Sequence, residues 1–396
     1  MLEAPADGAP ASPPELIRRA LQGRGLAYES LFEPDGVTDT YRRLQSWARQ
    51  QGDRALLLKA YSRLTAMLGL LGQQRESNEL LRELIETLTP DDGENLRSQV
   101  MEDLFERRRL IYSPDAPDAS AEWAAYTPPP PVVAHPVHDV LQILDPVHAV
   151  LPLLEYGWTL LVQGQLGEAT HCLETVVDLA RETGQPSIAS TAYHQLAVTA
   201  RILGHLEQSQ QLNEQSVTIN REIAGAAAEL GSMWPRIASA FLSLRLNRID
   251  EAERRLRRVL ELLDHRESFR NHRNSTNIGL GLVALARGER AEAKQRLTEA
   301  LADPVNLYPY THVRALLGLA HIAQSEEDAA ASAALLRQAL RFAGRRSLLE
   351  EYVETVLEIA ELRPTGAPVE RLVQATLANV KALGLESLAA TLSAQQ

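Results

Sequence analysis

A pattern of turn and apolar residues recurs about every 40 residues, and this repeat constrains the fold more than any other feature of the sequence. In each copy a turn residue precedes a small residue by five positions, and apolar side chains follow at helical spacing. The turn residues of four copies are Gly164, Gly204, Asn247 and Gly288, and the small residues of five copies are Ala169, Ser209, Ala252, Ala293 and Ser332. A fixed period of this length predicts stacked structural units instead of one globular core.

Each copy has the pattern of a helical hairpin. Gly and Asn tolerate the left-handed backbone that ends a helix, and the small residue lets a second helix approach the first closely. A further small residue lies seven positions before each turn, on one face of the first helix, at Gly157, Ala197, Ala240 and Gly281. The repeat therefore predicts tightly packed antiparallel helices of about 17 residues each.

Prolines mark the expected boundaries. Nine of the 21 prolines fall within residues 114–152, which excludes a continuous helix or a central strand in that segment. We expect five segments: a disordered tail at residues 1–14, helical hairpins at residues 15–111, a proline-rich linker or loop at residues 112–146, the repeats at residues 147–343 and capping helices at residues 344–396.

The predicted fold class is all-α. Alternating apolar and polar runs bounded by hairpin turns are missing from the sequence, apart from short pieces such as residues 131–133. Stacked helical hairpins form an α-α superhelix, a solenoid in which each unit packs on its neighbours.

Composition excludes several classes of function. The chain has 40 Lys and Arg against 52 Asp and Glu, a net charge of −12, which disfavours direct nucleic-acid binding. No segment has the length of apolar sequence that crosses a membrane. Cys172 is the single cysteine, so an intramolecular disulfide and a cysteine-rich zinc site are excluded. We expect a cytoplasmic protein without a nucleic-acid or membrane partner.

The hairpins resemble the tetratricopeptide repeat (TPR) family, most closely the longer-period variant found in the sensor regions of large bacterial ATP-binding transcriptional regulators. The resemblance covers residues 147–343 and extends to residues 56–88 through Gly72 and Ser77. The period exceeds the usual value of about 34, and the Trp-x-x-Leu-Gly opening of the first helix is missing. A generic α-solenoid therefore stays open as an alternative.

The sequence lacks the patterns typical of a catalytic or metal-binding site, which favours a chain that is not an enzyme. No glycine-rich loop has the Gly-Lys-Ser/Thr ending that holds a nucleotide. His135, His138 and Asp139 lie close in sequence, with His148 a little downstream, but no Glu-x-x-His motif or nearby Cys completes a tetrahedral site, so we interpret them as loop residues instead of a metal site. Cys172 fits a buried small thiol, and residues 107–109, three arginines, fit a solvated helix end. We expect no cofactor.

The resemblance implies a binding surface, because the first helices of TPR-like stacks line a concave groove. Aromatic and arginine side chains are frequent anchors of recognition surfaces. Packing of Trp158 and Phe241 inside the core between repeats is the alternative interpretation. The predicted groove residues are Trp158, His194, Arg201, Trp234, Phe241, Arg245, Arg314 and His321.

These residues favour a non-catalytic module that binds a peptide, a partner protein or a small effector, in bacterial signalling or transcriptional regulation. The alternative is a structural adaptor that acts through its convex face or its terminal helices. Arg201, Arg245 and Arg314 lie on three first helices, so we expect a basic stripe that attracts an acidic partner or a small anionic effector. On this hypothesis, glutamate at positions 245 and 314 abolishes binding and barely changes stability.

Overall fold

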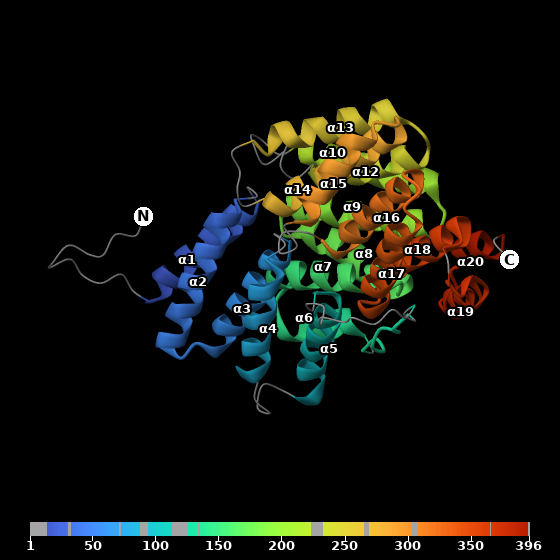
Figure 1. Cartoon of the computed structure of the whole chain (residues 1–396). Helices are drawn as coiled ribbons and strands as arrows, with labels where there is room; N and C mark the ends of the chain where they lie inside the picture. Colours follow the sequence, from blue (N-terminus) through green and yellow to red (C-terminus); the bar gives the residue numbers. More distant parts are fainter. Residues whose placement is uncertain are drawn as a thin grey trace.

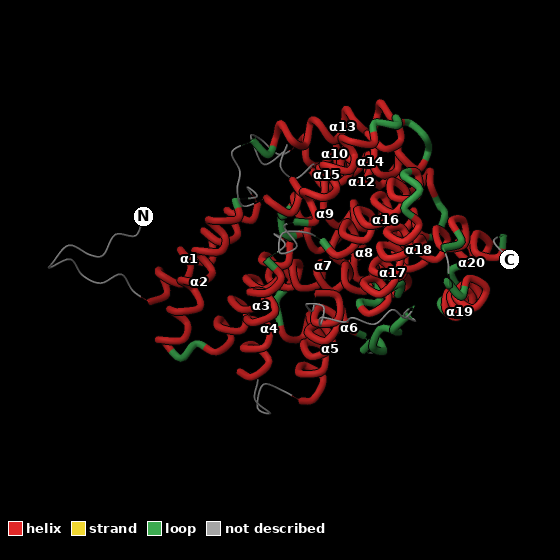
Figure 2. The backbone as a smooth tube through the Cα atoms, viewed as in Figure 1, coloured by secondary structure: helices red, strands yellow, loops and turns green. Residues whose placement is uncertain are grey.

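The computed structural model describes residues 14–30, 33–70, 73–87, 94–112, 123, 126–133, 135–222, 233–264, 269–302, 308–364 and 366–394. Among these residues the chain forms α-helices and no strand (Figures 1 and 2). The predicted tail lies almost entirely outside the described residues, and so do residues 113–122 of the predicted proline-rich loop.

Throughout most of the chain the described residues form helices. They are α1 (Pro14–Ser30), α2 (Pro34–Gln51), α3 (Arg54–Leu70), α4 (Gln74–Thr87), α5 (Glu94–Tyr112), α6 (Pro136–Ile143), α7 (Pro146–Val162), α8 (Leu166–Glu182), α9 (Pro186–Ile202), α10 (Leu206–Glu222), α12 (Met233–Arg245), α13 (Ile249–Leu262), α14 (Arg270–Ala286), α15 (Arg290–Leu301), α16 (Pro309–Ser325), α17 (Ala329–Arg345), α18 (Leu349–Leu362), α19 (Val369–Ala382) and α20 (Glu386–Ser393). No helix of the described residues is long and apolar enough to cross a membrane.

The predicted helical hairpins are confirmed, and they give the chain its superhelical fold. They are the pairs α7 and α8, α9 and α10, α12 and α13, α14 and α15, and α16 and α17. All four predicted turn residues have a positive φ: 81° at Gly164, 84° at Gly204, 57° at Asn247 and 80° at Gly288. The left-handed backbone that ends each first helix is therefore encoded locally.

The small residues lie where two helices of a hairpin cross. A Cβ added to Gly157 would stand 2.8 Å from a methyl carbon of Leu173, and one added to Gly281 would stand 2.9 Å from a methyl carbon of Leu297. Both distances are too short for van der Waals contact, so a larger residue forces the helices apart. The close approach of the hairpin helices depends on these glycines.

The C-terminal helices reach back to the first repeats, which closes the superhelix. Gly164, in the turn after α7, approaches Leu349 at the start of α18 so closely that it has no room for a Cβ. A Cβ on Gly204, in the turn after α9, would lie 2.6 Å from the hydroxyl oxygen of Ser387 in α20. Turns of the first and second hairpins therefore contact α18 and α20, which are far away in sequence.

Residues 126–133 of the proline-rich segment strengthen this closure. The backbone N–H of Thr127 donates to the carbonyl of Gly344 over 2.9 Å, and the Ser347 hydroxyl donates to the carbonyl of Thr127 over 2.6 Å. The ring of Tyr126 packs against that of Tyr352, with centroids 5.3 Å apart. This part of the segment is thus attached to the turn between α17 and α18.

The prediction of a solvated end for α5 was wrong for two of its three arginines. Arg107 and Arg108 are fully buried. Arg107 bonds Asp103 over 2.8 Å and donates to the carbonyl of Pro130 over 2.9 Å, while Arg108 lies 3.3 Å from the Glu155 carboxylate. Their burial follows from the packing of α5 against α7, a tertiary contact that composition alone does not reveal.

The glycine crossing gives a test of the packing. We predict that Gly281→Leu lowers the free energy of unfolding by about 1–3 kcal/mol or more, because the side chain must displace Leu297. The control is Glu292→Leu on the exposed face of α15, which we expect to change stability little. Urea unfolding followed by circular dichroism measures both. Equal stability of the two variants would contradict the assigned crossing.

Candidate functional site

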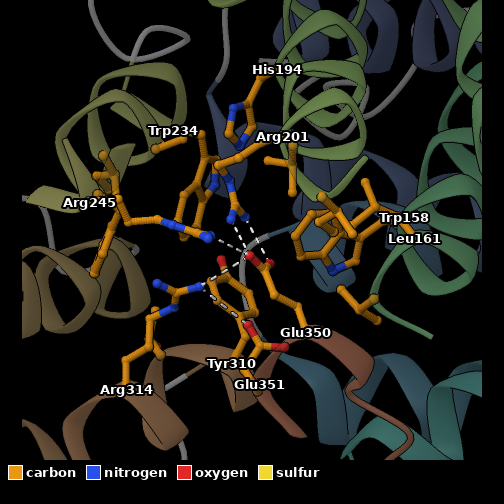
Figure 3. A pocket seen from close by; sticks show the side chains of 17 residues that line it. Trp158, Leu161, His194, Arg201, Trp234, Arg245, Tyr310, Arg314, Glu350 and Glu351 are labelled. Carbon is orange, nitrogen blue, oxygen red and sulfur yellow. Dashed lines mark hydrogen bonds and ion pairs between the residues drawn. The ribbon is translucent and has the colours of Figure 1, made fainter. Parts of the chain in front are cut away.

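The first helices bring most of the predicted groove residues to one pocket, shown in Figure 3. The space between its walls amounts to about 700 Å³, with the open mouth included. Seven of the eight predicted residues line it: Trp158, His194, Arg201, Trp234, Phe241, Arg245 and Arg314. They come from α7, α9, α12 and α16, so four first helices share the site.

Helical spacing explains why these side chains share a face. Trp234 and Phe241 are seven residues apart on α12, and Arg245 follows four residues later. His194 and Arg201 repeat the seven-residue spacing on α9. Residues at these separations lie above one another on a helix, and the stacking of repeats aligns the faces.

His321 is the predicted residue that the structure separates from the others. It lies on α16 outside the pocket, and its Nε2 is 2.7 Å from the carboxylate of Glu358. This contact raises the pKa of His321 although partial burial opposes the shift.

Three glutamates that the sequence analysis missed complete the site. Glu350 and Glu351 project from the first turn of α18 towards the arginines (Figure 3). Glu354 follows one turn further on and lies 3.7 Å from Arg245 and 3.3 Å from Arg314. Arg201 forms a two-pronged ion pair with Glu350, in which Nη2 lies 2.8 Å from Oε2. Nη1 of Arg245 lies 3.1 Å from the same carboxylate. One carboxylate therefore bridges arginines of two repeats.

Arg314 joins this cluster from α16. Its Nη2 lies 3.3 Å from Glu354, 3.7 Å from Glu351 and 3.8 Å from Glu350. Its guanidinium also stands over the ring of Phe241, 5.4 Å from the centroid. We call the three arginines and three glutamates the arginine–glutamate cluster.

This cluster corrects the expectation of a basic stripe. The three arginines gather around the start of α18 instead of forming a stripe, and each of them pairs with glutamates of that helix. A glutamate at position 314 would put a fourth carboxylate beside Glu350, Glu351 and Glu354 in a largely buried place, at a cost in stability. Exchange of Arg314 therefore does not separate binding from folding, and only Arg245, with 46% of its side chain exposed, remains suitable for that purpose.

The cluster separates the pKa values of two neighbouring carboxyl groups. Burial opposes ionisation of Glu350, but Arg201, Arg314 and Arg245 outweigh burial and lower its pKa to about 2. Burial and the adjacent charge of Glu350 raise the pKa of Glu351 to about 8. At neutral pH Glu350 is ionised and Glu351 is protonated.

The other half of the pocket is aromatic. The ring of Trp234 lies 4.4 Å from that of His272, 4.9 Å from that of Tyr308 and 6.4 Å from that of His194. Burial lowers the pKa of His194 to about 4 and that of His272 to about 3. Both imidazoles are neutral near pH 7, so this half of the pocket adds no charge.

A narrow space adjoins the pocket and shares Trp158, His194, Trp234 and Tyr310 with it. Glu155 also lines this space and pairs with Arg108. The shared side chains therefore separate the pocket from this narrow space.

The residues of the sequence-based metal search do not meet in a site. His138 contacts Gln142 on α6, and His148 contacts Asp145 with its Nδ1 over 2.6 Å. The part of the chain that the structure describes holds no group of three His, Cys, Asp or Glu side chains arranged for a metal ion. Cys172 is fully buried, as predicted.

Comparison with known proteins supports the fold. No family model and no curated protein matches the chain. Among solved structures, a Rap protein complexed with competence and sporulation factor is similar, with a TM-score of 0.50 and 14% identity over 86% of this chain and 96% of that chain. The Rap conjugation gene regulator of plasmid pLS20, in complex with a Phr peptide, has a TM-score of 0.47 and 13% identity over 84% and 85% of the two chains.

The similarity to the Rap protein complexed with competence and sporulation factor shows a shared fold and, at 14% identity, no more than that. The chain has a TPR-like helical-repeat fold, as the sequence predicts.

The two carboxyl groups give a prediction on pH. Between pH 4.5, the ordinary pKa of glutamate, and about pH 8, residue 351 is ionised in the unfolded chain and protonated in the folded one. The contribution of Glu351 to stability therefore decreases as pH rises through this range, and Glu351→Gln lacks this pH-dependent contribution.

We expect the melting temperature of Glu351→Gln to exceed that of the wild type by a margin that grows from pH 4.5 to pH 8 and is constant above. Differential scanning calorimetry at pH 5, 7 and 9 measures it, with Glu292→Gln on an exposed surface as control. Parallel curves for Glu351→Gln and wild type would contradict the assigned protonation.

Proposed function

We propose that this chain is a non-catalytic binding module that holds a short peptide in the pocket of Figure 3. The observation that carries the proposal is the convergence of seven predicted side chains from four helices on one pocket. Predominantly apolar walls with a few convergent polar groups are typical of ligand sites. Trp158, Trp234 and Phe241 supply anchors for apolar side chains, and the arginines supply orientation.

Two further considerations support a peptide and a regulatory role. The similar Rap protein is complexed with competence and sporulation factor, so a superhelix of this shape accommodates a bound factor. The long repeat period resembles that of sensor regions in bacterial ATP-binding regulators. We therefore assign the module to bacterial signalling or transcriptional control, in the cytoplasm.

A variant that fills the pocket tests the proposal. Ala238 lines the pocket and is partly exposed, so Ala238→Trp occupies the space without removing a contact of the cluster. We predict that the wild type retains members of a random pentapeptide library in affinity selection with mass spectrometry, and that Ala238→Trp retains at least tenfold less.

The matched control is Ser239→Trp, the next residue of α12, which faces a separate depression beside α10 and α13. This variant should retain the same peptides as the wild type. Retention of no peptide by the wild type would contradict the proposal and favour the adaptor, for which analytical ultracentrifugation would show self-association. Equal loss in both variants would place the binding site elsewhere on α12.

A further inference from the structure

Arg245 differs from the other two arginines of the cluster in its exposure. It lies at the pocket mouth with 46% of its side chain exposed, against 13% for Arg201 and for Arg314. Its contacts with α18 run through Nη1, which lies 3.1 Å from Glu350 and 3.7 Å from Glu354. A guanidinium has five N–H donors in a planar fork. The edge formed by Nε and Nη2 of Arg245 therefore has no partner among the described residues.

The contacts of Glu350 show how these arginines bind a carboxylate. Arg201 holds both of its oxygens, and Arg245 donates to one of them. Such two-pronged pairing is the strongest and most directional contact that a carboxylate makes with a side chain. The pocket thus already contains one bound carboxylate, supplied by the chain itself, and a second arginine edge of the same kind beside it.

Arg245 is the arginine of the cluster that solvent reaches most easily. Arg201 and Arg314 are largely covered and face the carboxyl groups of α18. Burial and the Glu350 charge raise the pKa of Glu351, which weakens the neutralisation of the arginines by that carboxyl group. The charge of Arg245 is therefore the one in the cluster that is most accessible to an anion from outside.

The surroundings of Arg245 are apolar on one side. Trp234 lines the same pocket as Arg245, and Phe241 precedes Arg245 by one helical turn on α12. Both aromatic residues line the pocket and are partly buried. A carboxylate on Arg245 would therefore have an apolar surface within reach of the neighbouring part of the same ligand.

We propose that Arg245 binds a carboxylate of the ligand through its Nε and Nη2 edge, while Trp234 and Phe241 contact an apolar side chain next to that carboxylate. The inference rests on the proposed peptide-binding function and adds the ligand class: peptides that present a carboxylate beside an apolar residue. The carboxylate is either the C-terminal group or an acidic side chain, and the two sources are chemically separable.

Four pentapeptide libraries test this proposal. They combine a free or an amidated C-terminus with the presence or absence of Asp and Glu at the randomised positions, and all other residues are identical. Retention on the wild-type chain is measured by affinity selection with mass spectrometry. We expect at least tenfold more retention from a library that carries the required carboxylate than from the amidated library without Asp and Glu.

The pattern of retention identifies the source. A preference for free C-termini assigns the C-terminal carboxylate, and a preference for Asp or Glu assigns an acidic side chain. Equal retention from all four libraries overturns the carboxylate site but leaves the proposed peptide-binding function intact. Retention from none of them overturns both.

Variants connect the preference to Arg245. Arg245→Gln should remove the preference for carboxylates while it keeps part of the apolar binding, because Trp234 and Phe241 stay in place. Arg245→Lys should restore the charge but only part of the preference, since lysine lacks the planar fork. Arg257→Gln on the exposed face of α13 is the control and should behave as the wild type. An Arg245→Gln variant that folds, as its melting temperature shows, and still prefers carboxylates would overturn the proposal.

Discussion

The carboxylate of Glu350 is the contact on which the closed form of this superhelix depends. It joins the ends of α9 and α12 to the start of α18, over 149 and 105 positions of sequence. In a solenoid each repeat contacts only its neighbours, so its two ends have no fixed distance. An ion pair of this kind is costly to break. Removal of one partner leaves an unpaired charge in the interior, which lowers the free energy of unfolding by about 3–5 kcal/mol. The cluster therefore fixes a distance that the local repeat contacts leave free.

Closure converts an open concave face into a pocket. Helix α18 brings two buried carboxyl groups to the arginines, and the attachment of residues 126–133 to the turn before α18 restrains the same helix from its other side. The aromatic residues of the first helices would line a wide groove without this restraint. With α18 in place, the pocket has a wall of opposite charge and its polar groups are largely withdrawn from solvent, where electrostatic contacts are stronger.

Local features of the sequence were sufficient to predict the hairpins and most of the pocket, whereas features that depend on curvature were not. Gly164 and Asn247 end helices through their own backbone preferences, and spacing places Trp234 and Phe241 on one face. The meeting of Glu350 with Arg201 depends on rotations summed over the four hairpins from α9 to α17, and no single segment encodes that sum. The prediction of an exposed Arg107 was wrong for the same reason. Its burial depends on the position of the end of α7 and of residues 126–133, which are distant from it in sequence.

Four charged residues of the cluster, two arginines and two glutamates, nevertheless obey a local rule once helix direction is known. The peptide dipoles of a helix favour cations near its C-terminus and anions near its N-terminus. Arg201 and Arg245 occupy the last turns of α9 and α12, and Glu350 and Glu351 occupy the first turn of α18. Each residue is thus suited to its own helix end before closure occurs. Closure then needs only to bring the C-terminal ends of two first helices against the N-terminal end of a third. Complementary charges meet there because the helix ends that meet have opposite polarity. The charged half of the pocket therefore follows from the direction of the helices, whereas the aromatic half follows from the spacing within the repeat.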